Sequence, residues 1–493
     1  MHEREPTSHQ PSLVSFRDPS GRLFSLNGRI LRGVHKSAVP DISACLASPA
    51  ARALVAAGRL VRTEILDSTA LKKLRTDVRL TEILDGTEWE MVLEHEKISF
   101  ATFPYEWAPE MLHSAGQLTL ELAQRLLIDG LGLKDATPYN ILFRGPKPVF
   151  IDILSVERRD PNDPTWIPYA QFVRTFLLPL LLNKHFDIPL QQIFTTRRDG
   201  VEPEEVYRLC GPLQKVKSPF LTLVTVPTLL GAKSWRAESN IYQKRHENNP
   251  EKARFVLEHV LNHLRRVLDR LEPKRARPSS WSNYMISDNS YSGDNFKAKH
   301  GFVEATLKEF RPKKVLDVGC NTGHFSAIAA NNGSAVVAID SDPSVVSTVY
   351  RNAVEQRLNI LPLTVDLTRS SPAIGWRNRE CPAFLSRAHG AFDAVFMLAV
   401  IHHMLVTERI PLSEIVNLSA ELTNDLLVIE FIGSDDPLFR HLARGRDALF
   451  SAITRDLFEA TCKRRFDIVR RQQLGASSRW LYLMRKTRFR DIA

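Results

Sequence analysis

A glycine-bearing turn between two apolar runs carries the clearest chemistry in this sequence. Val315–Val318 is typical of a buried strand, and the turn GCNTG follows at residues 319–323. Glycine lets a backbone approach a bound molecule closely. Asp340 ends the next apolar run, where a carboxylate can accept hydrogen bonds from ribose hydroxyls. The order of strand, turn, helix and strand predicts a nucleoside-binding βαβ unit.

The turn differs from two common nucleotide-binding patterns. It lacks the G-x-G-x-x-G spacing that places amides against a pyrophosphate, and no Gly-Lys-Ser/Thr follows as a P-loop requires. Asp317 lies two positions before Gly319, where a carboxylate repels phosphate but helps to hold a cationic amino-acid end. S-adenosylmethionine carries a sulfonium, an ammonium and a ribose without phosphate, so it fits this site better than NAD or ATP.

The segment resembles motif I, D-x-G-x-x-x-G, of class I S-adenosylmethionine-dependent methyltransferases. Later apolar runs resemble the remaining strands of that family in the expected order: 363–367, 392–398, 426–431, 466–470 and 480–484. The resemblance covers residues 281–493. It implies an α/β fold in which a Rossmann-like domain holds a seven-stranded mixed sheet with its last strand antiparallel. It also implies S-adenosyl-L-methionine as the cofactor.

The resemblance assigns the cofactor contacts to strand ends and to the turn. Asp317 and Asp340 would position the donor with the turn amides, and Asp366 would contact the adenine amine. Residues 281–300 would fold over the cofactor, and either Lys297 or Lys299 could pair with the methionine carboxylate. The predicted cofactor-binding residues are Asp317, Gly319, Cys320, Asn321, Gly323, Asp340, Asp366, Leu367, Met397, Tyr291 and Lys297, with Tyr284 as a further candidate.

Three titratable residues near the ends of the fourth and fifth strands are candidate catalytic groups. Methyl transfer is an in-line displacement, so the enzyme chiefly aligns the donor with the acceptor and excludes water. A hydroxyl or amine acceptor also needs a base, for which we name His402, His403 and Glu430. Either histidine could instead only pack or cap a helix. No N-P-P-Y or D-P-P-Y motif follows the fourth strand, which argues against nucleobase amines and glutamine amides. We therefore favour a small-molecule or saccharide acceptor, methylated on oxygen or nitrogen.

The chain before this domain predicts a second, α+β region. Residues 1–14 are rich in Ser, Pro, His and charge and predict a disordered tail, and residues 273–280 form a basic, proline-containing linker. Between them, residues 15–272 form the N-terminal region, and 281–493 form the methyltransferase domain. Predicted elements of the N-terminal region are a hairpin at 16–34, helices at 41–57, 69–84, 117–131 and 250–271, and a strand at 88–93.

Asp135, Asn140 and Asp152 form a second pattern in the N-terminal region. The spacing D-x-x-x-x-N with a later aspartate resembles the catalytic and magnesium-binding loops of kinase-like folds. Leu133 stands where those folds usually have histidine, and no glycine-rich loop precedes it. The resemblance implies a degenerate kinase-like scaffold, with Asn140 and Asp152 as metal ligands only if the region is active. The alternative function is a nucleotide- or partner-binding protein with a secondary or inactive methyltransferase domain.

Composition bounds the class of protein. A chain of 493 residues, 43% hydrophobic and 25% charged, indicates a globular protein of more than one domain. Its net charge of +10 is spread without an aromatic-basic repeat, so no nucleic-acid partner is indicated. Five dispersed cysteines show no zinc spacing, and no apolar run spans a bilayer, so we expect a cytoplasmic protein. The whole layout resembles the rhizobial host-specific nodulation proteins, which suggests a saccharide acceptor.

Overall fold

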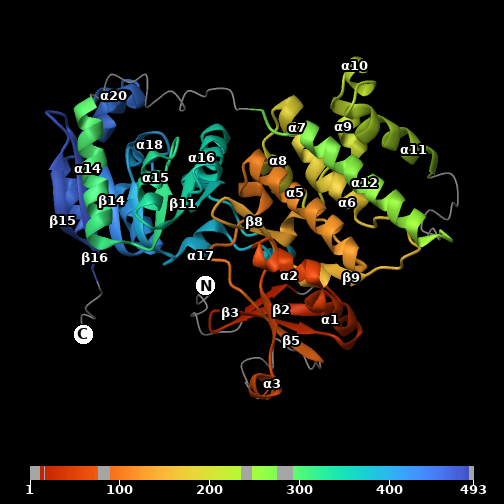
Figure 1. The fold of residues 1–493 in the computed structure, drawn as a ribbon. Helices are drawn as coiled ribbons and strands as arrows, with labels where there is room; N and C mark the ends of the chain where they lie inside the picture. The colour runs from red at the N-terminus through yellow and green to blue at the C-terminus, as the bar shows by residue number, and fades with distance from the viewer. Residues whose placement is uncertain (1–11, 16, 76–88, 235–246, 275–292, 488–493) are drawn as a thin grey trace.

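The computed structural model describes residues 12–15, 17–75, 89–234, 247–274 and 293–487. A small sheet and a group of helices precede an α/β domain, and the two parts lie side by side (Figure 1). Within the described ranges, no helix combines the length and apolar character needed to cross a membrane.

A seven-stranded sheet forms the C-terminal domain, in the order β12-β11-β10-β13-β14-β16-β15. Neighbours from β12 to β14 are parallel, whereas β16 runs antiparallel to both β14 and β15. This confirms the predicted Rossmann-like fold with its last strand antiparallel. The strands are β10 (Lys314–Val318), β11 (Ala335–Asp340), β12 (Ile360–Thr364), β13 (Phe392–Met397), β14 (Thr423–Ile432), β15 (Phe466–Gln473) and β16 (Arg479–Lys486).

Helices cover both faces of this sheet, which is why β12 and most of β10 and β11 are buried along their length. The strand order reverses between β10 and β13, and such a reversal opens a crevice at the carboxyl ends of the strands. The helices are α14 (Gly293–Phe310), α15 (His324–Asn331), α16 (Pro343–Glu355), α17 (Phe384–Ala388), α18 (Ile401–Val406), α19 (Leu412–Leu422), α20 (Pro437–Ala443) and α21 (Arg455–Cys462).

The N-terminal region begins with an antiparallel sheet in the order β1-β2-β3-β5-β4. The predicted hairpin is present, with Asn27 and Gly28 at φ 51° and 76° in its two-residue turn. Ser12–Ser15 pairs with β2, so part of the segment expected to be disordered is a strand. The strands are β1 (Ser12–Ser15), β2 (Gly21–Leu26), β3 (Arg29–Val34), β4 (Thr63–Ile65) and β5 (Met91–His95).

Helices make up most of the remaining N-terminal region. The helix predicted at 117–131 begins earlier, because Pro109 fits the first helical position. It ends at Leu126, and a 3-10 helix (Leu127–Asp129) then leads to Gly130 at φ 72°. Residues 76–88 and 275–292 fall outside the described ranges, and with them the end of the helix predicted at 69–84 and most of the linker. The helices are α1 (Val39–Ala47), α2 (Pro49–Ala56), α3 (Ser68–Arg75), α5 (Pro109–Leu126), α6 (Tyr169–Phe172), α7 (Leu178–Phe186), α8 (Leu190–Phe194), α9 (Pro203–Leu209), α10 (Pro212–Lys215), α11 (Val226–Ser234) and α12 (Pro250–Arg270). Short strands β6 (Leu131–Leu133), β7 (Ile141–Arg144), β8 (Lys147–Phe150) and β9 (Val156–Arg158) complete the region.

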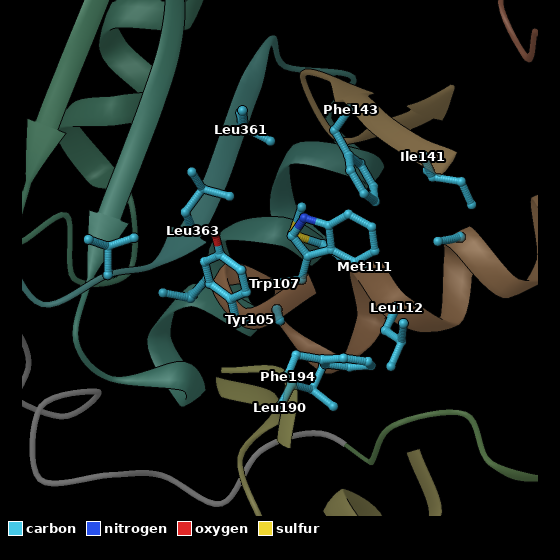
Figure 2. Close-up of a cluster of buried hydrophobic side chains, with 14 of the residues drawn as sticks. Tyr105, Trp107, Met111, Leu112, Ile141, Phe143, Leu190, Phe194, Leu361 and Leu363 are labelled. Carbon is cyan, nitrogen blue, oxygen red and sulfur yellow. The ribbon is translucent and has the colours of Figure 1, made fainter. Parts of the chain in front are cut away.

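One continuous hydrophobic core joins the two regions. Figure 2 shows Tyr105 and Trp107 of the N-terminal region beside Leu361 and Leu363 of β12. At the same interface a buried ion pair joins Glu106 to Arg387, with the two side chains 0% and 8% exposed. The sequence predicted two regions joined by a linker, whereas the structure shows them packed against each other.

Candidate functional site

The turn after β10 is fixed to the neighbouring strand by its backbone. The amides of Gly319 and Cys320 both donate to the carbonyl of Ile339, at 2.9 and 3.0 Å. Gly319 has φ +66°, and a Cβ added there would lie 2.5 Å from Cγ2 of Val400. Only glycine therefore fits at this position, and its missing side chain leaves the backbone of the turn open to a ligand.

Asp340 ends β11 and is held by two backbone donors. The amides of Asn321 and Asp342 donate to its two carboxylate oxygens, each at 3.0 Å. Burial raises the pKa of Asp340 above its usual value. A carboxylate fixed in this way at a sheet edge can accept hydrogen bonds from the hydroxyls of a ribose.

Asp317 lies deeper, and its side chain is almost fully buried. Its Oδ2 accepts a hydrogen bond of 2.5 Å from the hydroxyl of Ser326. Burial raises the pKa of Asp317 to about 7, and the nearby Asp340 adds to the shift. Asp317 can therefore respond to a cation in the cavity by releasing a proton near neutral pH.

A cavity with a volume of about 520 Å³ opens beside this turn. Its cofactor end contains seven of the predicted cofactor-binding residues: Asp317, Gly319, Cys320, Asn321, Asp340, Asp366 and Leu367. Asp366 begins a short 3-10 helix and accepts from the amide of Thr368 at 2.9 Å. The glycine turn and the carboxylates at the strand ends fit a phosphate-free nucleoside with a cationic side chain, as S-adenosylmethionine is.

The other predicted cofactor contacts lie outside this lining. Gly323 precedes α15 at φ +83°, and Met397 is buried in β13. Lys297 points to Asp294 with its side chain 82% exposed. Lys299 lines the cavity instead, because the helical phase of α14 turns it toward the sheet. Tyr284 and Tyr291 fall outside the described residues.

Lys299 belongs to a buried group of charges. Its Nζ donates to Oε2 of Glu430 at 2.7 Å, and both side chains are at most 1% exposed. Arg479 lies 3.9 Å from Oε1 of Glu430, and its Nε donates to Asp436 at 2.8 Å. Glu430 does not line the cavity. The geometry makes it a positioning residue for Lys299.

The two histidines after β13 have different surroundings. His403 lines the cavity, and burial lowers its pKa to about 4, so its ring is neutral at pH 7. His402 is 1% exposed, and neither ring nitrogen has a hydrogen-bond partner among the described residues. Burial also lowers the pKa of His402 well below its usual value. Of the three predicted catalytic candidates, the structure places only His403 in the cavity wall.

The sequence analysis missed several residues at the far end of the cavity. Ala399 has φ +54°, an unusual backbone for a residue with a side chain, and it lies between β13 and α18. The residues directly after the fourth strand could have been predicted from that position. The residues beyond the fifth strand belong to no motif. Besides Leu398 and Ala399, which directly follow β13, the residues at this end are Val400, Met404, Thr407, Glu408, Leu442, Arg444 and Arg446.

The Asp317 environment predicts that S-adenosylmethionine binding releases a proton. Below pH 7 the free protein holds Asp317 protonated, and a bound cation favours the carboxylate. Affinity should therefore rise with pH below 7, by at most about tenfold per pH unit, and level off above it. Calorimetry at pH 6.5 in two buffers of different ionisation enthalpy measures the release. In Asp317→Asn, the proton release and the pH dependence of affinity that come from Asp317 should be lost. An equal dependence of the binding enthalpy on the buffer in the wild type and in Asp317→Asn would contradict the role of Asp317.

The N-terminal polar cluster of Asp135, Asn140 and Asp152 is also present. Arg32 donates to Oδ1 of Asp152 at 2.7 Å, and the hydroxyl of Ser155 donates to Oδ2 at 2.6 Å. Asn140 donates to the same hydroxyl at 3.0 Å. Burial raises the pKa of Asp135. Both oxygens of Asp152 are thus engaged by the protein, and across the described ranges no group of His, Cys, Asp and Glu is arranged to hold a metal.

Comparison with known proteins tests the class of enzyme. Residues 316–420, which include the turn and strands β11 to β13, match a family model described as a methyltransferase domain. The ubiquinone biosynthesis O-methyltransferase of Caulobacter vibrioides is 32% identical over 100 residues, or 20% of this chain and 34% of that enzyme. The N-methyltransferase NodS from Bradyrhizobium japonicum WM9, in complex with S-adenosyl-l-homocysteine, matches 42% of this chain and 97% of its own at 15% identity, with a TM-score of 0.31.

A longer match extends over both regions. Nodulation protein NoeA from Rhizobium meliloti (strain 1021) is 30% identical over 476 residues, which are 96% of this chain and 95% of that protein. The predicted methyltransferase class and the predicted resemblance to nodulation proteins are both confirmed. Since the match includes nearly the whole of both proteins, the chain belongs to the family of nodulation protein NoeA, and it is an S-adenosylmethionine-dependent methyltransferase.

Proposed function

We propose that this methyltransferase acts on an oxygen or nitrogen of a small-molecule or saccharide acceptor. One observation carries the proposal: a single cavity runs from the cofactor turn past His403 to a wall that includes Met404, Thr407 and Leu442. A cavity of about 520 Å³ lies in the size range of sites for small ligands. A sugar or metabolite can enter such a cavity.

The chain's own residues would align the donor and the acceptor. When bound, S-adenosylmethionine supplies a methyl group activated by a positive sulfur. Asp340 would hold the ribose, Asp366 the adenine and Lys299 the carboxylate. His403 is neutral at pH 7 and lies in the same cavity, so it would accept the proton of a hydroxyl or an ammonium acceptor.

Among these acceptors we favour a saccharide. NoeA is called a nodulation protein, and its match covers the N-terminal region as well as the methyltransferase domain. We infer that this chain modifies a signalling or cell-surface saccharide or its precursor. A cytoplasmic site of action, with S-adenosylmethionine as donor, is part of the proposal, and the five buried free thiols support it.

We assign the N-terminal cluster a structural role. Arg32 neutralises Asp152, and Ser155 joins Asp152 to Asn140, so the group stabilises the loop between η4 (Pro138–Asn140) and η5 (Ile153–Ser155). Phosphotransfer needs such carboxylates to bind magnesium. The geometry thus favours a scaffold over the alternative of a nucleotide-binding protein.

Methyl labelling tests the acceptor class. The protein is incubated with S-adenosylmethionine that carries a labelled methyl group, together with metabolites from a strain that lacks the protein. We expect label in the small-molecule or saccharide fraction. Label that appears only in protein or nucleic acid would contradict the proposal.

His403→Gln should lower kcat by about 100-fold or more, because general-base catalysis typically contributes 10²–10⁴-fold. The substitution leaves the cofactor end intact, so the affinity for S-adenosylmethionine should stay within about twofold. In the wild type, kcat/KM should fall below about pH 4, where His403 takes up a proton. His389→Gln, at an exposed site outside the cavity, is the control. An unchanged kcat in His403→Gln would remove this residue from catalysis.

A further inference from the structure

Two arginines, Arg444 and Arg446, line the same cavity as the cofactor turn. They follow α20, a helix that packs against α18, the helix of His403. In the view of Figure 1, α20 lies above the strands of the C-terminal sheet. Both arginines therefore belong to the segments that follow β13 and β14, whereas the glycine turn, Asp340 and Asp366 lie at the ends of β10, β11 and β12.

The chain turns sharply at the end of α20. Arg444 and Gly445 have φ 49° and 77°, two successive residues in the left-handed region. The amide of Arg444 donates to Arg440 at 3.1 Å, which closes the helix. Arg446 is then fixed by two bonds to the carbonyl of Ala443, from its amide at 3.0 Å and from its Nε at 3.2 Å. This side-chain bond uses only Nε, so the two Nη groups of Arg446 take no part in it.

Both arginines are exposed where they line the cavity. No carboxylate lies within 4.0 Å of either guanidinium among the side chains that the structure describes. Glu408, an acidic residue of the same cavity lining, is paired with Arg369 at 2.6 Å. At the cofactor end, Asp340 and Asp366 are engaged by backbone amides. Two arginines that form no ion pair with a described side chain thus line the cavity.

We propose that Arg444 and Arg446 form an oxyanion-binding subsite, so that the methyl acceptor carries a phosphate or carboxylate group. This inference rests on the proposed function and narrows its acceptor class to anionic molecules. The planar fork of a guanidinium matches phosphate and carboxylate oxygens, with which it forms charge-assisted hydrogen bonds. The subsite would hold the anionic group near the mouth while the accepting hydroxyl or amine reaches His403.

The methionine carboxylate of the donor is a competing occupant. Lys299 of α14 lines the cavity beside the turn that follows β10, and we assign the methionine carboxylate to its ammonium group. Arg444 and Arg446 lie on a different segment, after α20. Substitution of these arginines should therefore weaken the binding of acceptor anions and leave the binding of the donor unchanged.

Calorimetry on the full-length protein, saturated with S-adenosylhomocysteine and kept at constant ionic strength, tests the subsite. The probes are inorganic phosphate and acetate. We expect the wild type to bind at least one of them, and the double variant R444Q/R446Q to bind it at least tenfold more weakly. Arg440→Gln is the matched control, because Arg440 is an exposed arginine of the same helix outside the cavity, and it should bind like the wild type.

The outcomes separate the inference from the proposed function. Binding of phosphate alone identifies a phosphate acceptor, and binding of acetate alone a carboxylate. Absence of both, or equal binding to the wild type and R444Q/R446Q, overturns the subsite. A tenfold loss of S-adenosylhomocysteine affinity in R444Q/R446Q also overturns it, because the arginines would then hold the donor. Failure of the wild type to bind S-adenosylhomocysteine would instead overturn the proposed function. The phosphate and acetate titrations would then be made without S-adenosylhomocysteine, and they would still test the subsite.

Discussion

Gly319→Arg abolishes S-adenosylmethionine binding while the N-terminal region stays folded. The new Cβ alone would approach Cγ2 of Val400 to 2.5 Å, and the φ of +66° is strained for any side chain. The guanidinium would in addition enter the space beside the turn. We expect an affinity loss of about 1,000-fold or more, which corresponds to about 4 kcal/mol. Calorimetry with S-adenosylmethionine measures the loss directly.

Gly333→Ala provides the control for backbone strain. Gly333 also has a positive φ, +91°, but a Cβ there meets nothing within 4 Å. This variant should lose about 1 kcal/mol of stability and keep its affinity for the cofactor. Retained affinity in Gly319→Arg, or an equal loss in Gly333→Ala, would show that the site lies elsewhere.

Arg387→Ala should lower the free energy of unfolding by about 3–5 kcal/mol. The substitution leaves Glu106 charged and 0% exposed at the interface of the two regions. It also removes the guanidinium that lies 5.0 Å from the ring centre of Phe103 and 5.5 Å from that of Phe384. Urea denaturation, followed by circular dichroism, measures the loss.

A surface ion pair supplies the matched control for Arg387→Ala. Arg254 and Glu258 pair across one turn of α12, with side chains 51% and 45% exposed. Glu258→Ala should therefore cost only about 0.3–0.5 kcal/mol, because solvent screens such pairs. A loss below about 1 kcal/mol in Arg387→Ala would show that the two regions do not depend on this contact.

The sequence predicted the C-terminal sheet closely, because parallel strands covered on both faces are continuous apolar runs. The run at 392–398 contains β13, and the run at 426–431 lies within β14. The Asn27-Gly28 hairpin could be predicted equally well, because the residues that form its turn are neighbours in the sequence. Asp340 and Asp366 were predicted from their places at strand ends, and the structure puts both in the cavity.

Long-range packing was not readable from the sequence. Lys297 and Lys299 are two positions apart on α14, and only the packing of that helix on the sheet shows which one faces the cavity. Glu430 lies in β14 beyond the cavity wall, so its contact with Lys299 depends on a distant helix. Arg444 and Arg446 follow no periodic pattern. The shared core of the two regions likewise joins segments far apart in the chain.

A crystal structure of the protein with S-adenosylhomocysteine tests the central claim most directly. The account predicts the ligand beside the turn at 319–323, with its ribose hydroxyls within hydrogen-bonding distance of Asp340 and its adenine near Asp366. A ligand bound elsewhere, or a ribose that makes no contact with Asp340, would contradict it.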